Sequence, residues 1–193
     1  MRHNNIRDFE ASLLREICKD VKVEPMLLPV GETATRSSNL AEKARLDVSA
    51  VGVWSSMERT FLDVRVVHLN SPSYINQTPE QTYQQHEREK KRNYNDRILQ
   101  VEKGSFSPLI FSTTGGMGPE CTRFHKRVAE LLSAKRGESY PHVMNFIRTR
   151  IRFSLLRSTL VAIRGERGRG NRSGVPISEL SLNLVPERSS YEV

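Results

Sequence analysis

The sequence predicts a mixed α/β fold in which helices flank a central β-sheet. Apolar residues recur at helical spacing in some segments, and alternating or continuous apolar runs of strand length lie between these segments. The predicted elements follow in the order helix, three strands, helix, strand and two helices, which favours a mixed sheet covered by helices. A length of 193 residues suits one domain with a sizeable core.

The first half of the chain is predicted to contain one helix and three strands. Ile6, Leu13 and Ile17 recur on one side of an amphipathic segment, with charged residues between them. The third strand is apolar on both faces apart from a few charged residues, which is typical of a central strand in a covered sheet. The predicted ranges are a helix over 6–22, strands over 21–24, 44–53 and 60–69, and a loop over 31–43.

The second half is predicted to contain three helices and one strand. Thr78 is suited to the N-cap of the first helix, Pro79 to its first position and Gly104 to its end. The predicted ranges are helices over 78–103, 119–135 and 140–164 and a strand over 106–112.

The composition points to an anionic partner. The net charge is +8 and the sequence pI is about 9.8, so we expect nucleic acid, with a membrane surface as the alternative. No apolar run is long enough to span a bilayer. Cys18 and Cys121 lack metal-ligand spacing, which favours packing roles in a reducing compartment.

Two aspartates fall in adjacent predicted strands. Asp47 and Asp63 could converge at one end of the sheet and bind Mg²⁺ or Mn²⁺, because such cations need only one or two carboxylates. The alternative is that Asp47 caps a strand and Asp63 pairs with Arg65.

Three further segments are candidates for contacts with phosphate. Lys90 and Tyr94 lie four residues apart on one helix face and could serve the metal site, or they could be solvated and packed. The glycine-rich segment 115–118 precedes a helix and could bind phosphate through its amides, or it could be a plain turn. Arginines of the last helix could follow a nucleic-acid backbone, or line a solvated face. The candidates for backbone contacts are Arg65, Lys91, Arg148, Arg152 and Arg157.

In order along the chain, these segments resemble the restriction-like endonuclease domain of site-specific non-LTR retrotransposons, in the PD-(D/E)xK superfamily. The matching pieces are Arg-Leu-Asp at 45–47, Phe-Leu-Asp-Val-Arg-Val at 61–66, Glu-Lys at 89–90 followed by Tyr94, and Phe-Ser-Pro-Leu-Ile-Phe-Ser at 106–112. The resemblance covers residues 1–165 and implies an αβββαβ core with additional C-terminal helices. It leaves 166–193 as a basic and polar tail, which we expect to be disordered.

The resemblance implies Mg²⁺-dependent nicking of target DNA that primes reverse transcription. Asp47 and Asp63 match the acidic pair of that family, and Lys90 and Tyr94 match its helix motif. The chain departs from the pattern at three positions. Leu46 replaces a proline, Arg65 stands where the wider superfamily has lysine, and Asn93 stands where the family often has a second lysine.

The resemblance also implies partners and a location. The chain would be the carboxyl-terminal piece of a reverse-transcriptase polyprotein, with upstream reverse-transcriptase and zinc-knuckle regions, and His3 would be left over from that junction. It would act on DNA in the nucleus, possess no membrane anchor and contact the RNA of the element. Two other hypotheses remain open, namely an inactive nucleic-acid-binding module on the same fold and a protein-interaction domain.

Overall fold

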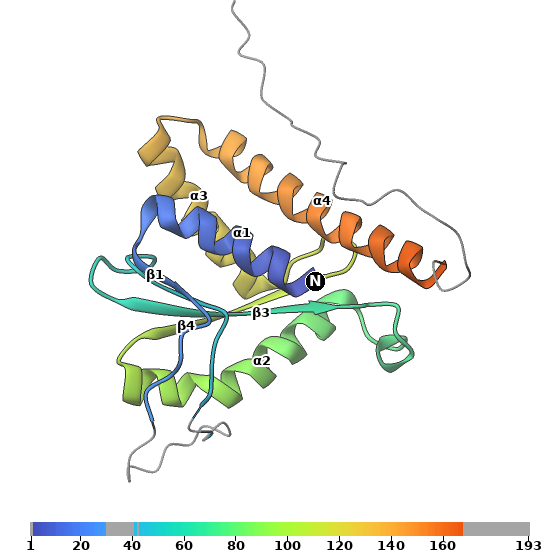
Figure 1. Ribbon diagram of the computed structural model, residues 1–193, viewed down its shortest axis with the longest axis horizontal. Helices are drawn as coiled ribbons and strands as arrows, with labels where there is room; N and C mark the ends of the chain where they lie inside the picture. Colours follow the sequence, from blue (N-terminus) through green and yellow to red (C-terminus); the bar gives the residue numbers. More distant parts are fainter. Residues whose placement is uncertain (1, 30–40, 42, 168–193) are drawn as a thin grey trace, which may run out of the picture.

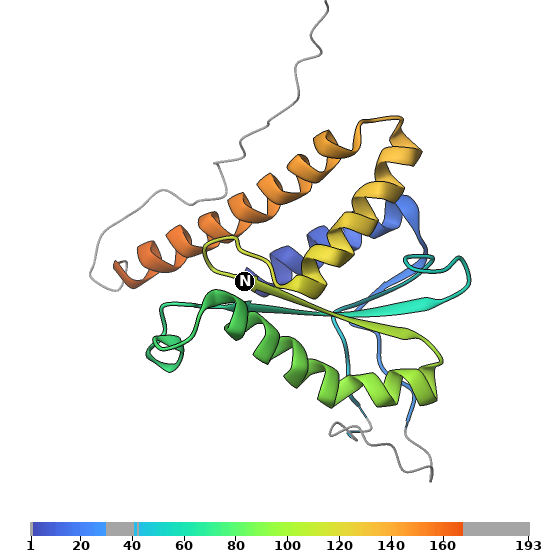
Figure 2. The ribbon, with the colours of Figure 1, turned by 180° about the vertical axis from the view of Figure 1, so that it is seen from behind.

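A four-stranded mixed sheet runs through the centre of the molecule, as Figures 1 and 2 show from opposite sides. The computed structural model describes residues 2–29, 41 and 43–167. The strands lie in the order β1-β2-β3-β4, where β1, β2 and β3 are antiparallel neighbours and β4 is parallel to β3. Their bounds are β1 (Lys19–Val23), β2 (Val48–Val51), β3 (Arg59–Val67) and β4 (Ser105–Ser112). The predicted mixed α/β class is therefore confirmed.

Helices cover both faces of this sheet. The helices α1, α3 and α4 lie on one face and α2 lies on the other (Figure 1). A short 3₁₀ turn, η1, precedes α2, and a π-helical turn, η2, follows it. The bounds are α1 (Arg2–Ile17), η1 (Pro72–Tyr74), α2 (Pro79–Arg97), η2 (Ile98–Glu102), α3 (Pro119–Arg136) and α4 (Tyr140–Arg167). Among the described residues, no helix combines the length and the apolar content needed to cross a bilayer.

The central strand β3 is buried on both faces because its side chains alternate between two apolar layers. Leu62 and Val64 belong to the core formed with α1, α3 and α4. Phe61 and Val67 belong to two smaller clusters on the side of α2. The positions between Phe61 and Val67 that share their parity therefore also face α2, and Asp63 is one of them.

The helix α2 begins at the predicted N-cap. The Thr78 side chain accepts a hydrogen bond from the Gln81 amide, the Gln81 side chain accepts one from the Thr78 amide, and Pro79 follows the cap. The regular helix ends earlier than predicted, and the chain continues through the wider η2 before Lys103 adopts φ 53°. Gly104 then lies against the carbonyl of Arg59, where a side chain would clash.

Several boundaries in the first half differ from the predicted ones. The first helix was expected over 6–22, but it ends at Ile17 because the residues from Lys19 onward pair with β2, whose Val51 is the partner of Lys19. The strand expected over 44–53 is regular only in β2, and the residues before it form a single bridge between Met26 and Arg45. Most of the loop predicted over 31–43, and residues 168–193 of the predicted tail, lie outside the described residues.

Candidate functional site

The candidate site lies where β3 separates from β2. The last pair between these strands joins Val48 to Leu62, whereas the next residue of β3, Asp63, pairs only with Pro108 of β4. Asp47 directly precedes β2, and its amide donates to the Leu62 carbonyl over 3.1 Å. The backbone therefore holds Asp47 beside Asp63, at an edge of β3 that β2 has left open.

The Asp47 carboxylate satisfies that open edge. Its Oδ2 accepts a hydrogen bond from the Val64 amide at 2.6 Å and one from His3 Nε2 at 3.0 Å. Its side chain is 13% exposed. Asp47 thus caps a strand, which was the predicted alternative to a metal-binding role. The same hydrogen bonds also fix the direction of its carboxylate.

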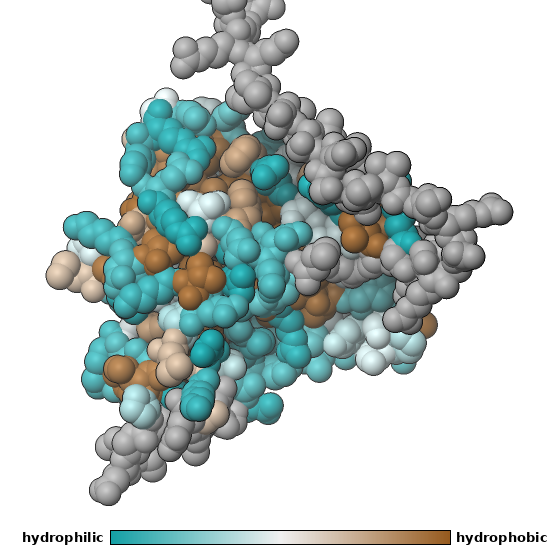
Figure 3. Space-filling view, viewed as in Figure 1, coloured by the Kyte–Doolittle hydropathy of each residue, from teal (hydrophilic) through white to brown (hydrophobic). Residues whose placement is uncertain are grey.

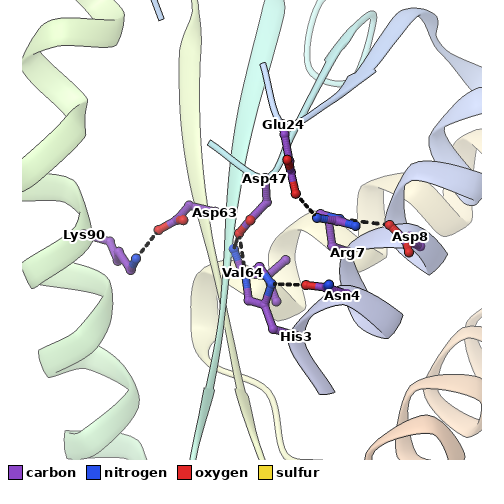
Figure 4. Close-up of polar contacts among 9 residues, drawn as sticks. All are labelled: His3, Asn4, Arg7, Asp8, Glu24, Asp47, Asp63, Val64 and Lys90. Atoms are coloured by element: carbon purple, nitrogen blue, oxygen red, sulfur yellow. Dashed lines mark hydrogen bonds and ion pairs between the residues drawn. The ribbon is translucent and has the colours of Figure 1, made fainter. Parts of the chain in front are cut away.

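The Asp63 carboxylate faces α2 and meets Lys90. Lys90 Nζ lies 2.5 Å from Asp63 Oδ2, and the two side chains are 18% and 10% exposed. Among the described residues this buried oxygen accepts no hydrogen bond of ordinary geometry, although Lys90 lies within ion-pair distance. Figure 4 shows Asp47 and Asp63 next to each other, with Lys90 and His3 approaching from opposite sides of the sheet.

Burial and neighbouring charges shift the pKa values of two groups at the site. Burial raises the pKa of the Asp63 carboxyl and the neighbouring Asp47 raises it further, while the Lys90 ammonium acts in the opposite direction. The hydrogen bond to Asp47 raises the pKa of His3, because the carboxylate stabilises the imidazolium form. An added cation would favour the ionised form of Asp63, because a positive charge beside the carboxylate offsets the effect of its burial.

The donor set fits a hard divalent cation that has few protein ligands. Within the described ranges, no three or more His, Cys, Asp or Glu side chains come together as a metal-binding group. Mg²⁺ retains several waters and needs only one or two carboxylates, and Asp47 and Asp63 would supply these. The buried Oδ2 of Asp63, whose close described contact is with the Lys90 ammonium, is an oxygen that such a cation could bind in exchange for that contact.

Tyr94 lies beneath Lys90 on the same helix face. The Lys90 ammonium is 5.8 Å from the centroid of the Tyr94 ring, and the ring packs against Phe106 of β4 with centroids 5.7 Å apart. The aromatic face attracts the ammonium, so Tyr94 restricts where Lys90 can point.

Arg65 and Lys91 are held in pairs within the protein. Pairing of Arg65 with Asp63 was the alternative to a metal site. The Arg65 guanidinium instead lies 2.8 Å from Glu89 of α2 and 3.0 Å from His86. Lys91 lies 2.8 Å from Glu120 and joins α2 to α3. Both cations are therefore already neutralised by an acid, which weakens their candidacy for contacts with a nucleic-acid backbone.

The glycine-rich turn packs closely against α2. A side chain at Gly116 would meet Tyr83, and one at Gly118 would meet Glu87. The Glu87 carboxylate accepts the Glu120 amide at 2.9 Å, in the first turn of α3. A carboxylate of the chain itself thus accepts the Glu120 amide, and burial raises the pKa of Glu87.

Glu10, an acid of α1, lies apart from the candidate site. It is fully buried, and its Oε1 lies 2.8 Å from His125 Nε2 on α3. Its described contacts therefore belong to the interior between α1 and α3, apart from the aspartate pair. The arginines at 148, 152 and 157 are exposed on α4.

Comparisons with known proteins add no family to this geometry. No model of a known protein family matches the chain, and no curated protein matches it. A function for the chain therefore has to follow from its residues and their arrangement.

Sequence reasoning missed His3 as a contact of Asp47, and no pattern near residue 3 indicates that contact. The orientation of Lys90 had a usable signal. Tyr83, Tyr94 and Ile98 lie 7, 4 and 8 residues from Lys90, and all of these spacings place them on its side of the helix. Tyr83 and Ile98 are buried, so this aromatic and apolar stripe turns Lys90 toward the sheet.

Proposed function

We propose that the chain is a Mg²⁺-dependent DNA endonuclease domain that nicks DNA by hydrolysing a phosphodiester. The observation that carries this proposal is the convergence of Asp47, Asp63 and Lys90 where β3 leaves β2. Two adjacent carboxylates beside a lysine combine a cation site with a group that can neutralise a phosphate.

The order of the elements supports the restriction-like form of this proposal. The chain runs α1, β1, β2, β3, α2 and β4, which is the αβββαβ order that the resemblance to retrotransposon endonucleases implies, and two helices follow. Under this proposal the chain belongs to a reverse-transcriptase polyprotein and acts on target DNA in the nucleus. Its upstream reverse-transcriptase and zinc-knuckle regions and the RNA of the element would be its partners.

Each residue of the site has a distinct role in the proposed reaction. Mg²⁺, when bound by Asp47 and Asp63, would polarise the scissile phosphate and lower the pKa of a water. Val64 and His3 hold the Asp47 carboxylate in place through hydrogen bonds. Lys90 would exchange its contact with Asp63 for a phosphate oxygen and stabilise the developing negative charge.

A nicking assay on supercoiled plasmid tests the proposal. We expect the purified chain to convert plasmid to the open circle with Mg²⁺ or Mn²⁺ and to stop when EDTA is added. Asp63→Asn should lower the rate at least about a hundredfold, because it removes a charged ligand while keeping the shape of the side chain. Asp96→Asn on the same helix as Lys90 is the charge-matched control and should nick at the normal rate. Equal nicking by Asp63→Asn would refute the proposed site.

A second candidate is a nucleic-acid-binding module without catalysis. It is favoured by one observation, namely that the present contacts already partner both carboxylates, Asp47 with His3 and Asp63 with Lys90. This candidate predicts salt-sensitive DNA binding and no nicking at any Mg²⁺ or Mn²⁺ concentration. It also predicts that Asp63→Asn binds DNA as tightly as the unmodified chain.

A further inference from the structure

The helix α4 carries a one-sided charge that the protein does not neutralise. From Tyr140 to Arg164 the sequence contains arginines and no aspartate or glutamate. These arginines are exposed, and none of them forms an ion pair with another side chain in the described part of the chain. They are Arg148, Arg150, Arg152, Arg157 and Arg164. By contrast, Arg7 and Arg59 pair with acids nearby.

Exposed aromatic and aliphatic side chains alternate with some of these arginines. Phe146, Phe153 and Leu160 are spaced by seven residues, or two helical turns, and are 40%, 48% and 50% exposed. Arg150 and Arg157 fall between them on the same stripe. The Phe146 ring already contacts the Phe9 ring and the Arg136 guanidinium, whereas the Phe153 ring has Arg150 and Arg157 one turn before and one turn after it on the helix.

This stripe borders a groove between α1 and α4. The groove has a volume of about 370 Å³, and its lining includes Asn5 and Phe9 from α1 and Arg150, Phe153 and Arg157 from α4. The Arg150 guanidinium lies 6.0 Å from the Phe9 ring centroid. The one acid in the lining, Asp8, is held by the Arg7 guanidinium at 2.9 Å. Hydrophobic and hydrophilic side chains are interleaved on this side of the molecule, where α1 and α4 lie side by side (Figures 1 and 3).

We propose that the α1–α4 groove binds a single-stranded segment of nucleic acid, with a base stacked on Phe153 and phosphates held by Arg150 and Arg157. Guanidinium groups bind phosphate oxygens in pairs of hydrogen bonds, and an exposed phenylalanine offers a stacking surface to any base. A duplex keeps its bases stacked internally and would leave Phe153 without a base to cover it. A partner helix would need acids to match the unpaired arginines.

The groove and the aspartate site share the N-terminal end of α1. Asn5 lies in the lining of the groove, and His3, two residues earlier on another side of the same helix, contacts Asp47. A strand leaving the groove would have to pass around the N-terminal end of α1 to reach Asp47. This inference rests on the proposed endonuclease function for the purpose of the bound strand, although binding itself needs neither metal nor cleavage.

Fluorescence anisotropy with labelled oligothymidine, oligouridine and a DNA duplex of equal length tests this site. EDTA is present throughout, so cleavage cannot contribute. The unmodified chain should bind the single strands more tightly than the duplex. Phe153→Leu keeps an apolar side chain and removes the ring, and it should weaken binding of both single strands by roughly five- to a hundredfold.

The arginines are tested by their effect on the salt dependence. Arg150→Gln with Arg157→Gln should reduce the slope of log affinity against log salt by about 1.4, since each phosphate contact on a single strand contributes about 0.7. Arg15→Gln, at an exposed arginine of α1, is the matched control and should change the slope by much less. Circular dichroism verifies that each variant is folded.

Three results would overturn the inference. The first is equal affinity of Phe153→Leu and the unmodified chain for oligothymidine. The second is a preference for duplex that the variants share. The third is a dimer, detected by light scattering, that dissociates in Phe153→Leu. The last result would identify the stripe as a contact between copies of the chain. Asp63→Asn separates this test from that of the endonuclease, because it should lose nicking and keep single-strand binding.

Discussion

The Lys90 ammonium lies 2.5 Å from Oδ2 of Asp63, so an ion pair joins the middle of α2 to the middle of β3. Both side chains are largely shielded from water. A pair of this kind contributes little more than two well-packed apolar residues would, but removing one partner leaves a buried charge that is costly. Lys90 and Asp63 therefore couple the stability of the domain to its proposed chemistry.

Replacing Lys90 with methionine should damage both properties. We expect Lys90→Met to lower plasmid nicking at least about a hundredfold and the free energy of unfolding by about 2–3 kcal/mol, because Asp63 loses its counter-charge. Nicking and urea unfolding measure the two effects. Lys126→Met, at an exposed lysine of α3, is the control and should change neither. Normal nicking by Lys90→Met would show that the lysine has no part in the reaction.

The ring of Tyr94 should matter more than its hydroxyl. Its described contacts, with Lys90 and Phe106, run through the ring. Tyr94→Phe should therefore retain nicking within about threefold, whereas Tyr94→Leu should lower it about tenfold by releasing Lys90. A loss in Tyr94→Phe as large as that in Tyr94→Leu would instead assign the role to the hydroxyl.

Mg²⁺ should stabilise the folded chain without any substrate. A ligand that binds only the folded state at ten times its dissociation constant adds about 1.4 kcal/mol, which is measurable as a rise in melting temperature. Asp63→Asn should abolish most of this rise, and Asp96→Asn should preserve it. A rise of equal size in Asp63→Asn would place the ion elsewhere.

Cys18 should react slowly with alkylating reagents. Burial raises the pKa of the Cys18 thiol to about 11, against an ordinary value of 9.0, while Arg127 opposes the shift. The reactive thiolate should thus be roughly a hundredfold scarcer than usual at pH 8, and alkylation correspondingly slower than in denaturant. The Cys121→Ser variant isolates Cys18 for this measurement by iodoacetamide labelling. Equal rates in the folded and denatured chains would contradict the shift.

Arg97 should be a major contributor to stability. It is fully buried, and its guanidinium donates to the carbonyls of Leu28 and Ala41 over 2.8 Å each. We expect Arg97→Met to lower the free energy of unfolding in urea by about 2–4 kcal/mol, since these carbonyls lose charged donors. The exposed Arg92→Met is the control, and an equal cost in both variants would contradict this role.

The central strand and the start of the helix after it were predictable because each carries its own local signal. The alternation and apolar content of 60–69 indicated β3, and Thr78 with Pro79 indicated the start of α2. The ends of helices and strands that carry no local signal were not predictable. Ile17 ends α1 because the following residues pair with β2, and that pairing depends on contacts far along the chain.

The site was predictable in its residue types and only partly in its contacts. Two acids in neighbouring strands are visible in the sequence, and so is the lysine on the following helix. Arg65 was expected as a possible partner of Asp63 because the two share a face, yet it pairs with Glu89. The choice depends on where α2 docks against β3, and that is set by packing of Tyr83 and Ile98 rather than by spacing along the strand.

The alternation of side chains along β3 limits which sequence changes this domain can tolerate. A substitution leaves every other side chain on its side of the sheet, whereas an insertion of one residue before Leu62 would exchange the two sides. Asp63 and Arg65 would then enter the apolar layer under α1, and Leu62 and Val64 would face Lys90. The core and the candidate site depend on the same alternation of side chains, so a substitution at Asp63 could remove the proposed chemistry and leave the fold, whereas a shift of one residue would disrupt both.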